Sequence, residues 1–374
     1  MKKLLLKLLG GEKWQMLRIS VFSIVISLFA GAVILLLIGR NPISAYLNLL
    51  QGSGLFPKHS YAGRQNMLTD FGGLLCALTP MIFAALSVAV ALKGGLFNIG
   101  VSGMMMSAGF VASVTVGMSG LNHIIARPLV VLIGIVTGAA IGALIGWLKY
   151  RFNINEVVSS IMLNYILMYV ITFFINTKYI NAVSRQSQPI NDSARLVLED
   201  TGLFGLKLDI PLAFPLAIIT AFIVRFFLER TTAGFEIKAV GLSRSAARYA
   251  GINIESNILL TMVISGALAG LAGVTYFCGY FASIQPGVVP SMGFNAIAVA
   301  LLGGSDPVGC IFASFLITVI SKGSIYLSSQ QGVEIEIADL ITAIILIFSA
   351  CSEFIRMYVG TLMTESGEAA ADKE

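Results

Sequence analysis

The chain has 374 residues, of which 57% are hydrophobic and only 11% are charged, and its formal net charge is +5. An ordinary soluble domain has about 25% charged residues, so this composition excludes a water-soluble globular protein. The modest net charge gives no indication of nucleic-acid binding, because no basic stripe is interleaved with aromatic residues.

The apolar runs are continuous and do not alternate with a period of two, which favours helices over a membrane β-barrel. Each crossing needs about 20 apolar residues, so the chain has material for about eight to ten spans. The sequence therefore predicts an all-α polytopic membrane protein with about 8–10 transmembrane helices, some of them broken or half-length.

The first apolar run, at 17–38, follows a basic head at 1–16 that contains Lys2, Lys3, Lys7 and Lys13. The run is too long for a signal-peptide core, so it is predicted to be an uncleaved span with its N-terminus in the cytoplasm. A polar stretch at 39–70 is expected to be a loop with one short surface helix. Further spans are expected at 71–92, 97–118, 128–148, 156–176, 210–228, 257–281, 291–302, 308–327 and 337–358. The transmembrane domain thus covers 17–358, and the acidic tail at 359–374 is expected to be disordered.

Positive residues support this topology. Alternating spans place the loops at 93–96, 149–155, 229–256 and 303–307 in the cytoplasm, and the first three carry Lys or Arg. The run at 291–302 is too short for a full crossing and is predicted to be a half-helix or a re-entrant segment. In either case nine spans remain and the C-terminus lies outside.

Glycines recur at every fourth position in two of the predicted spans, at Gly134, Gly138, Gly142 and Gly146 and again at Gly266 and Gly270. Small residues at this spacing let helix backbones approach closely in lipid. The pattern predicts a compact helix bundle.

The loop at 229–256 is the most charged of the predicted cytoplasmic loops. Ser243 or Ser245 can cap a short helix at about 245–250, and Gly251 can end it. A short amphipathic helix at the cytoplasmic face suits the docking of a soluble partner. A helix lying on lipid headgroups would have the same pattern.

Two segments resemble the starts of interrupted helices, from which transporters build solute sites. Gly94 and Gly95 break the chain before Asn98, and prolines and glycines at 285–304 surround Asn295. The pairs Phe97-Asn98 and Phe294-Asn295 stand at comparable places in the two halves, which is compatible with an internal repeat. A simple capped turn between spans also explains the first segment.

A third polar group opens the span at 156–176. Glu156 at the first position is stabilised by the helix dipole, so capping is its simpler role. Asn164 and Tyr165 lie two turns further in. A buried amide in lipid needs a partner, which is either another helix or a solute.

Several motifs are absent from the sequence. It contains no G-x-x-x-x-G-K-[ST] loop for ATP, no HExxH or GxSxG motif, and no acid well inside a predicted span. Its two histidines and four separated cysteines give no indication of a metal site. We therefore expect neither an enzyme nor a cofactor-binding chain.

Four stretches carry a family resemblance. The run GLFNIG at 95–100 resembles the GxFNIG signature of permeases in the branched-chain amino acid, ribose and nucleoside branch of ABC importers. NEVV and MLNY within 155–165 are similar to the nucleoside sub-branch, whose partner is a basic-membrane-protein-type lipoprotein. The loop at 234–252 resembles the ATPase-coupling loop of this family, and AIAVALLGGSDPVG at 296–309 resembles its late glycine-rich segment. Where relatives often carry Glu-Gly-Gln after FNIG, this chain has Val101-Ser102-Gly103-Met104.

The resemblance implies an inner-membrane importer made of two related permeases and two ATPase subunits, fed by an extracytoplasmic solute-binding lipoprotein. ATP is then hydrolysed by the partner subunit, and this chain moves a small polar solute, with a nucleoside as the first choice. A ribose-type sugar permease and a stand-alone secondary carrier are the alternatives. The expected solute-path residues are Asn98, Glu156, Asn164, Tyr165 and Asn295. The expected ATPase-coupling residues are Glu236, Lys238, Gly241, Arg244, Ser245, Ala246, Ala247, Arg248 and Gly251.

Overall fold

The computed structural model describes residues 15–61, 65–199, 201, 207–332, 340 and 343–344. The acidic tail at 359–374, nearly all of the basic head at 1–16 and most of the predicted span at 337–358 lie outside the described residues.

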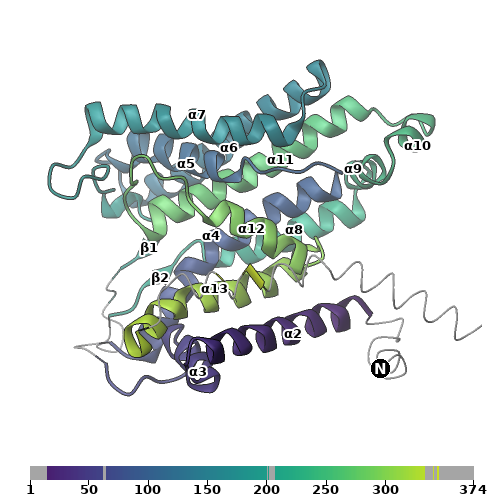
Figure 1. The fold of residues 1–374 in the computed structure, drawn as a ribbon. Helices are drawn as coiled ribbons and strands as arrows, with labels where there is room; N and C mark the ends of the chain where they lie inside the picture. Colours follow the sequence, from purple (N-terminus) through teal and green to yellow (C-terminus); the bar gives the residue numbers. More distant parts are fainter. Residues whose placement is uncertain are drawn as a thin grey trace, which may run out of the picture.

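The described part of the chain is mostly helical (Figure 1). Its α-helices are α2 Gln15–Leu37, α3 Pro42–Gly52, α4 Met67–Lys93, α5 Val101–Ala112, α6 His123–Phe152, α7 Glu156–Phe174, α8 Phe214–Arg230, α9 Thr232–Leu242, α10 Arg244–Tyr249, α11 Ile254–Thr275, α12 Met292–Leu302 and α13 Pro307–Gln331. Short π-helical turns, η2 Ser113–Gly117, η3 Ile175–Tyr179 and η6 Tyr276–Tyr280, extend α5, α7 and α11, and η4 Asp192–Ala194 is a 3₁₀ turn. Strands β1 Val197–Leu198 and β2 Ile210–Pro211 pair antiparallel.

The predicted all-α membrane fold is confirmed. Five described helices are long and apolar enough to cross a membrane: α4, α6, α7 with η3, α11 with η6, and α13. A sixth span results if the end of α2 and α3, which meet at a bend of 116°, count as one. The predicted number of eight to ten includes shorter pieces, because α8 has 17 residues and the apolar helices at Val101–Gly117 and Met292–Leu302 are shorter than a full crossing. Helix α12 has 11 residues, which confirms the prediction that 291–302 is too short for a full span.

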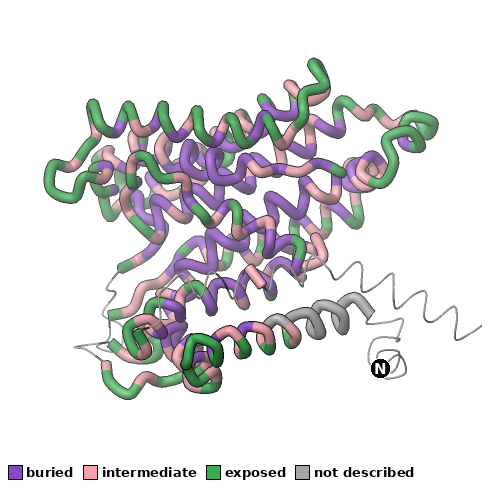
Figure 2. The backbone as a smooth tube through the Cα atoms, viewed as in Figure 1, coloured by how far each residue is buried: buried purple, intermediate pink, exposed green. Residues whose placement is uncertain are grey.

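Helix α4 forms the centre of the bundle. Its charged residues, Asp70 and Lys93, stand near its two ends, and everything between is apolar, small or uncharged. A helix that is hydrophobic on all sides is buried, and 94% of the apolar window of α4 is buried inside the protein, against 28% for α7. Figure 2 shows the same contrast between the buried interior and the exposed outer helix α7.

The glycine spacing predicts close helix packing, and the structure shows that α6 and α11 pack against each other through these glycines. A Cβ added to Gly138 would overlap the carbonyl oxygen of Gly266, and one added to Gly270 would overlap that of Gly134. The two backbones therefore touch directly, and no side chain larger than hydrogen fits between them.

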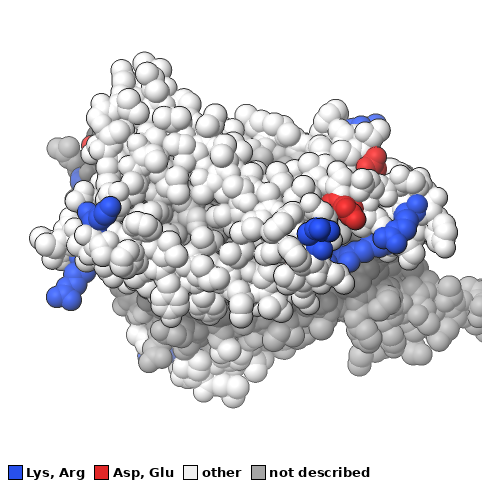
Figure 3. Space-filling view, turned by 90° about the horizontal axis from the view of Figure 1, so that it is seen from above, with Lys and Arg blue, Asp and Glu red and all other residues white. Residues whose placement is uncertain are grey.

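The two ends of the bundle differ in content. Helices α9 and α10 lie at one end of the bundle, which we call the α10 end (Figure 1). Strands β1 and β2 and the turn at α3 lie at the opposite end, which we call the β1–β2 end. Two loops predicted to share a side with α9 and α10 also lie at the α10 end. The turn after α4 contacts Gly241 of α9 through Lys93 and Gly95. The α6–α7 loop ends at Glu156, which interacts electrostatically with Arg244 of α10. On the face shown in Figure 3, charged side chains gather at the two ends and leave a broad belt between them free of charge. Such a belt suits the hydrocarbon layer of a membrane.

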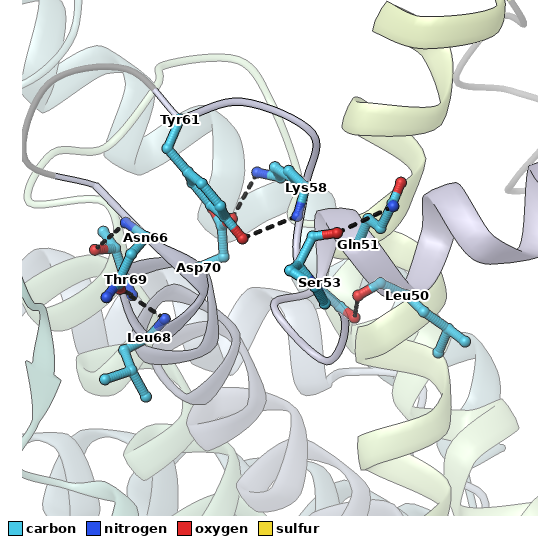
Figure 4. Close-up of polar contacts among 10 residues, drawn as sticks. Leu50, Gln51, Ser53, Lys58, Tyr61, Asn66, Leu68, Thr69 and Asp70 are labelled. Carbon is cyan, nitrogen blue, oxygen red and sulfur yellow. Dashed lines mark hydrogen bonds and ion pairs between the residues drawn. The ribbon is translucent and has the colours of Figure 1, made fainter.

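The segment between α3 and α4 is fixed at the β1–β2 end (Figure 4). Lys58 Nζ lies 2.7 Å from a carboxylate oxygen of Asp70, and the Lys58 amide donates to the Tyr61 hydroxyl at 3.0 Å. Asn66 and Thr69 form a capping box at the start of α4. The short helix expected in this stretch is present as α3, but it is packed rather than superficial, because Gly52 lies against Gly323 of α13.

Candidate functional site

The α9–α10 segment forms two short helices with separate caps. The Gly234 amide donates to the Thr231 hydroxyl at the start of α9, and the Ala246 amide donates to Ser243 Oγ at 3.3 Å at the start of α10. Ser243 is therefore the cap, and the predicted helix begins one residue earlier than expected. Gly251, with φ +79°, follows its end, as a glycine in the left-handed region commonly does.

Helix α10 is held to the protein by one buried side chain, Ala247. Its other residues, including Arg244, Ser245, Ala246 and Arg248, are exposed, and Tyr249 is 95% exposed. Nearly the whole helix is thus free to contact something outside this chain.

The predicted coupling residues on α9 lie against the neighbouring long helices. Glu236 accepts a hydrogen bond of 2.9 Å from the Asn257 side chain of α11, and Lys238 is half-buried. Gly241 touches the turn after α4: an added Cβ would overlap the carbonyl oxygen of Lys93 and lie 2.9 Å from the amide nitrogen of Gly95. Gly95 itself has φ +65°. The end of α9 therefore rests directly on the turn that leads to Asn98.

Asn98 is buried and uses both ends of its amide within the protein. Its Oδ1 accepts from the Gly100 amide at 2.9 Å, and its Nδ2 donates to Ser265 Oγ at 2.8 Å. Ser265 and Ser87 each donate to the other's carbonyl oxygen, at 2.8 and 2.7 Å. Asn98 thereby joins the start of α5 to the crossing of α4 and α11.

Asn164 of α7 is also buried, and it forms hydrogen bonds with the backbone at the start of α5. Its Oδ1 accepts from the Gly103 amide and its Nδ2 donates to the Ile99 carbonyl, both at 2.9 Å. The first amides of a helix have no partner inside the helix. Asn164 satisfies one of them from a neighbouring span.

The starts of the two short helices α5 and α12 meet. Ser102 Oγ donates to the Pro290 carbonyl at 2.8 Å, and a Cβ added to Gly293 would lie 2.7 Å from the Ser102 amide nitrogen. The comparable sequence positions of Phe97-Asn98 and Phe294-Asn295 thus correspond to neighbouring helix starts. We call this contact region the helix junction, comprising residues 98–103, 290–293, Asn164 and Ser265.

A cavity of about 170 Å³ lies beside the helix junction, between α4, α12, α13 and the end of α11. Asn295 is the one predicted solute-path residue that lines it. Other lining residues used below are Tyr276, Tyr280, Phe281, Thr318 and Lys322.

Lys322 is the residue that the sequence argument missed. It lies within α13, and its Nζ donates to the Tyr280 hydroxyl at 3.2 Å and stands 5.2 Å from the Tyr280 ring centroid. A signal was present in the sequence, since a charged residue inside an apolar run is costly in a membrane and usually serves function. A search for acids alone passes over a lysine within the predicted span at 308–327.

Glu156 and Tyr165 lie away from the cavity. Glu156 opens α7 and forms an ion pair of 2.8 Å with Lys149 at the α10 end, while Asn155 caps the helix. Tyr165 is 54% exposed on α7. Among the described residues there is no cluster of three or more His, Cys, Asp or Glu side chains that could hold a metal ion.

This fold, with an exposed helix at one end and a polar cavity within the bundle, defines a membrane permease. Residues 71–350 match the family described as "Branched-chain amino acid transport system / permease component". The chain therefore belongs to this family, and it is a multi-pass membrane permease of an ABC importer that is not itself catalytic.

Three curated relatives resemble nearly the whole chain. The nucleoside ABC transporter permease protein NupB of Lactococcus lactis is 34% identical, with 91% of this chain and 92% of the relative covered. The guanosine ABC transporter permease protein NupP of Bacillus subtilis is 35% identical, with 92% and 96% covered. The glucose ABC transporter permease protein TsgB13 of Haloferax volcanii is 26% identical, with 96% and 94% covered.

Proposed function

We propose that this chain is the permease subunit of a nucleoside importer and that it moves its solute into the cytoplasm by alternating access. The observation that carries the importer mechanism is the exposed helix α10, which is joined through α9 to the turn before the helix junction. The nucleoside assignment is supported by the two relatives with nucleoside names, which are 34% and 35% identical, against 26% for the glucose permease.

In this mechanism the ATPase subunit binds α10 through Arg244, Ser245, Ala246, Arg248 and the turn at Gly251. Ala247 is buried and anchors the helix. A helix this short moves as a unit, so a force on its exposed face is transmitted to α9. ATP is hydrolysed in the partner, and this chain supplies no covalent chemistry.

The next step passes from α9 to the helix junction. Gly241 touches Lys93 and Gly95 through backbone atoms. A shift of α9 therefore displaces the turn after α4 directly, because no flexible side chain lies between them to absorb the movement. Asn98 then links that turn to α5 and α11. The helix junction is therefore the point at which the motion of the ATPase would open or close the cavity.

The proposed solute path runs beside Asn295. Asn98 and Asn164 do not line the cavity; they stabilise the helix junction beside it, because their side-chain amides are hydrogen-bonded within the protein. Glu156 and Tyr165, which the sequence also favoured, would act from outside the cavity, Glu156 near the coupling segment and Tyr165 on the outer face of α7.

The proposed complex contains a second related permease, ABC ATPase subunits and an extracytoplasmic solute-binding lipoprotein. The α10 end then faces the cytoplasm, as does the N-terminus of the chain. This orientation agrees with the lysines and arginines in the loops at that end.

Cysteine labelling tests the orientation. Ser245→Cys places a thiol on α10, and Val183→Cys places a control thiol on a residue that is 94% exposed at the β1–β2 end. Three of the four native cysteines, Cys76, Cys278 and Cys310, are buried, and the fourth, Cys351, is replaced by alanine in both variants. We expect a membrane-impermeant maleimide to label intact cells at position 183 and not at position 245; the reverse pattern would overturn the docking role of α10.

Reconstitution tests the transport reaction. With the ATPase, the second permease and the lipoprotein present, liposomes should take up nucleosides only when ATP is supplied. Uptake of the solute by this chain alone under an ion gradient would establish a secondary carrier instead. Uptake of ribose or glucose in place of nucleosides would establish a sugar permease.

A further inference from the structure

The cavity around Lys322 contains polar groups that the protein does not satisfy. Thr318 is only 4% exposed, and its hydroxyl has no hydrogen-bond partner in the described structure. Lys322 has three N–H donors, of which one is directed to Tyr280. In the described part of the chain no carboxylate lies within 4 Å of its Nζ.

Aromatic side chains flank the same cavity. The rings of Tyr276 and Phe281 are 4.8 Å apart, and the Tyr280 ring lies 4.7 Å from that of Phe281. A flat, polarisable ligand such as a nucleobase can stack on such rings. Unpaired polar groups that face an aromatic cavity in a membrane protein indicate a ligand with its own polar atoms.

The lysine restricts the chemistry of that ligand. An ammonium group can only donate hydrogen bonds, so it favours an acceptor and disfavours a donor. Guanine offers two adjacent acceptors, O6 and N7, and the corresponding edge of uracil offers O4, whereas adenine and cytosine place an amino group there. A lysine that faces the base is therefore expected to favour oxo bases over amino bases.

We propose that Lys322 is a specificity-determining residue of this permease, selecting nucleosides whose base carries an oxo group where adenine and cytosine carry an amino group. This inference rests on the proposed nucleoside transport. It predicts a preference for guanosine, inosine and uridine that comes from one side chain within the membrane-spanning chain, in addition to any selection by the binding protein.

The test uses the complete transporter in proteoliposomes with ATP and one unchanged binding protein. Lys322→Met removes the charge and keeps the length of the side chain. We expect kcat/KM for guanosine and inosine to fall about tenfold, which is the size of one bidentate base contact, and kcat/KM for uridine, which offers the single acceptor O4, to fall by a smaller factor. The values for adenosine and cytidine should stay within about twofold. Lys178→Met, an exposed lysine on η3 at the same end of the bundle, is the matched control and should change neither group.

Lys322→Gln keeps the proposal testable even if the methionine variant fails to insert. The glutamine amide can accept as well as donate, and it pairs well with adenine N6 and N7. We expect this variant to raise the uptake ratio of adenosine to guanosine above that of the wild type. A purely structural role for Lys322 would lower all nucleosides equally in both variants, and that result would overturn the inference.

The two proposals fail in different ways. If the wild-type transporter takes up nucleosides but no variant changes the ratio of oxo to amino bases, only the role of Lys322 is overturned. If the wild type takes up no nucleoside at all, the proposed function falls and takes this inference with it.

Discussion

The helix junction and the cavity lie side by side but treat their polar groups in opposite ways. At the junction, Asn98 and Asn164 have their amide oxygen and nitrogen bonded to protein. In the cavity, among the residues that the structure describes, the Thr318 hydroxyl has no partner and Lys322 bonds only to Tyr280. A buried polar group without a partner is costly. The junction is therefore suited to a rigid structural role, and the cavity is suited to binding a polar ligand.

Because of this difference, asparagines at comparable sequence positions have different expected roles. Asn98 and Asn295 occupy comparable places in the two halves of the sequence, yet only Asn295 lines the cavity. Substitutions at the junction should therefore affect folding and coupling, whereas substitutions in the cavity should affect solute affinity. The following variants test that division.

The largest effect is expected for Gly241→Val. The new side chain would overlap Lys93 and press on Gly95, displacing α9 from the helix junction. Overpacking of this kind costs about 1–3 kcal/mol, and because it falls on the coupling contact we expect ATP-driven uptake to drop by at least about tenfold. ATPase binding should persist, because α10 is untouched.

The measurement for Gly241→Val is uptake together with solute-stimulated ATP hydrolysis. Gly120→Val is the control, since a Cβ there meets nothing within 4 Å. Normal coupling in both variants would show that motion does not pass through the contact between Gly241 and Gly95.

Asn164→Ala should mainly reduce stability. The change leaves the Gly103 amide and the Ile99 carbonyl unpaired in a buried place. Each orphaned group costs about 1–3 kcal/mol, so the purified protein should lose several degrees in its melting temperature in detergent. Selectivity among nucleosides should not change; an altered preference with normal stability would put Asn164 on the solute path after all.

Asn295→Ala should raise KM without affecting stability. One neutral hydrogen bond contributes about 0.5–1.5 kcal/mol, so we expect a rise of about two- to tenfold. Initial rates of nucleoside uptake at several concentrations measure it, and thermal unfolding provides the control. A lower melting temperature with unchanged KM would mean that the side chain supports the fold instead.

Tyr165→Ala should have the smallest effect. It is adjacent to Asn164 in sequence but 54% exposed, and exposed substitutions usually change stability by less than about 0.5 kcal/mol. Comparison with Asn164→Ala in the same melting experiment isolates burial from position in the chain. A large loss for Tyr165→Ala would show that this face of α7 is covered in the assembled transporter.

Features encoded by neighbouring residues could be predicted from the sequence. Apolar runs identified the helices, Ser243 and Gly251 marked the ends of α10, and the four-residue glycine spacing marked α6 and α11 as closely packed helices without naming their partners. Each of these signals lies within one segment, and each depends on physics that operates over a few residues.

Contacts between distant residues were beyond the sequence argument. Asn98 and Ser265 are 167 positions apart, and nothing in either segment specifies the other. For Asn98 and Asn164 the sequence could not distinguish a solute-binding role from a structural role, because only the packed structure shows whether an amide already has hydrogen-bond partners. Lys322 was visible as a charge within a span, but its neighbour Tyr280 comes from a different helix.

The interlocked glycines of α6 and α11 restrict how this permease can change shape. Where two backbones mesh without side chains between them, neither can slide along the other or rotate on its axis without atomic overlap. The pair must therefore travel as one rigid strut throughout a transport cycle. Relative movement during the cycle then has to occur between this strut and the helices outside it.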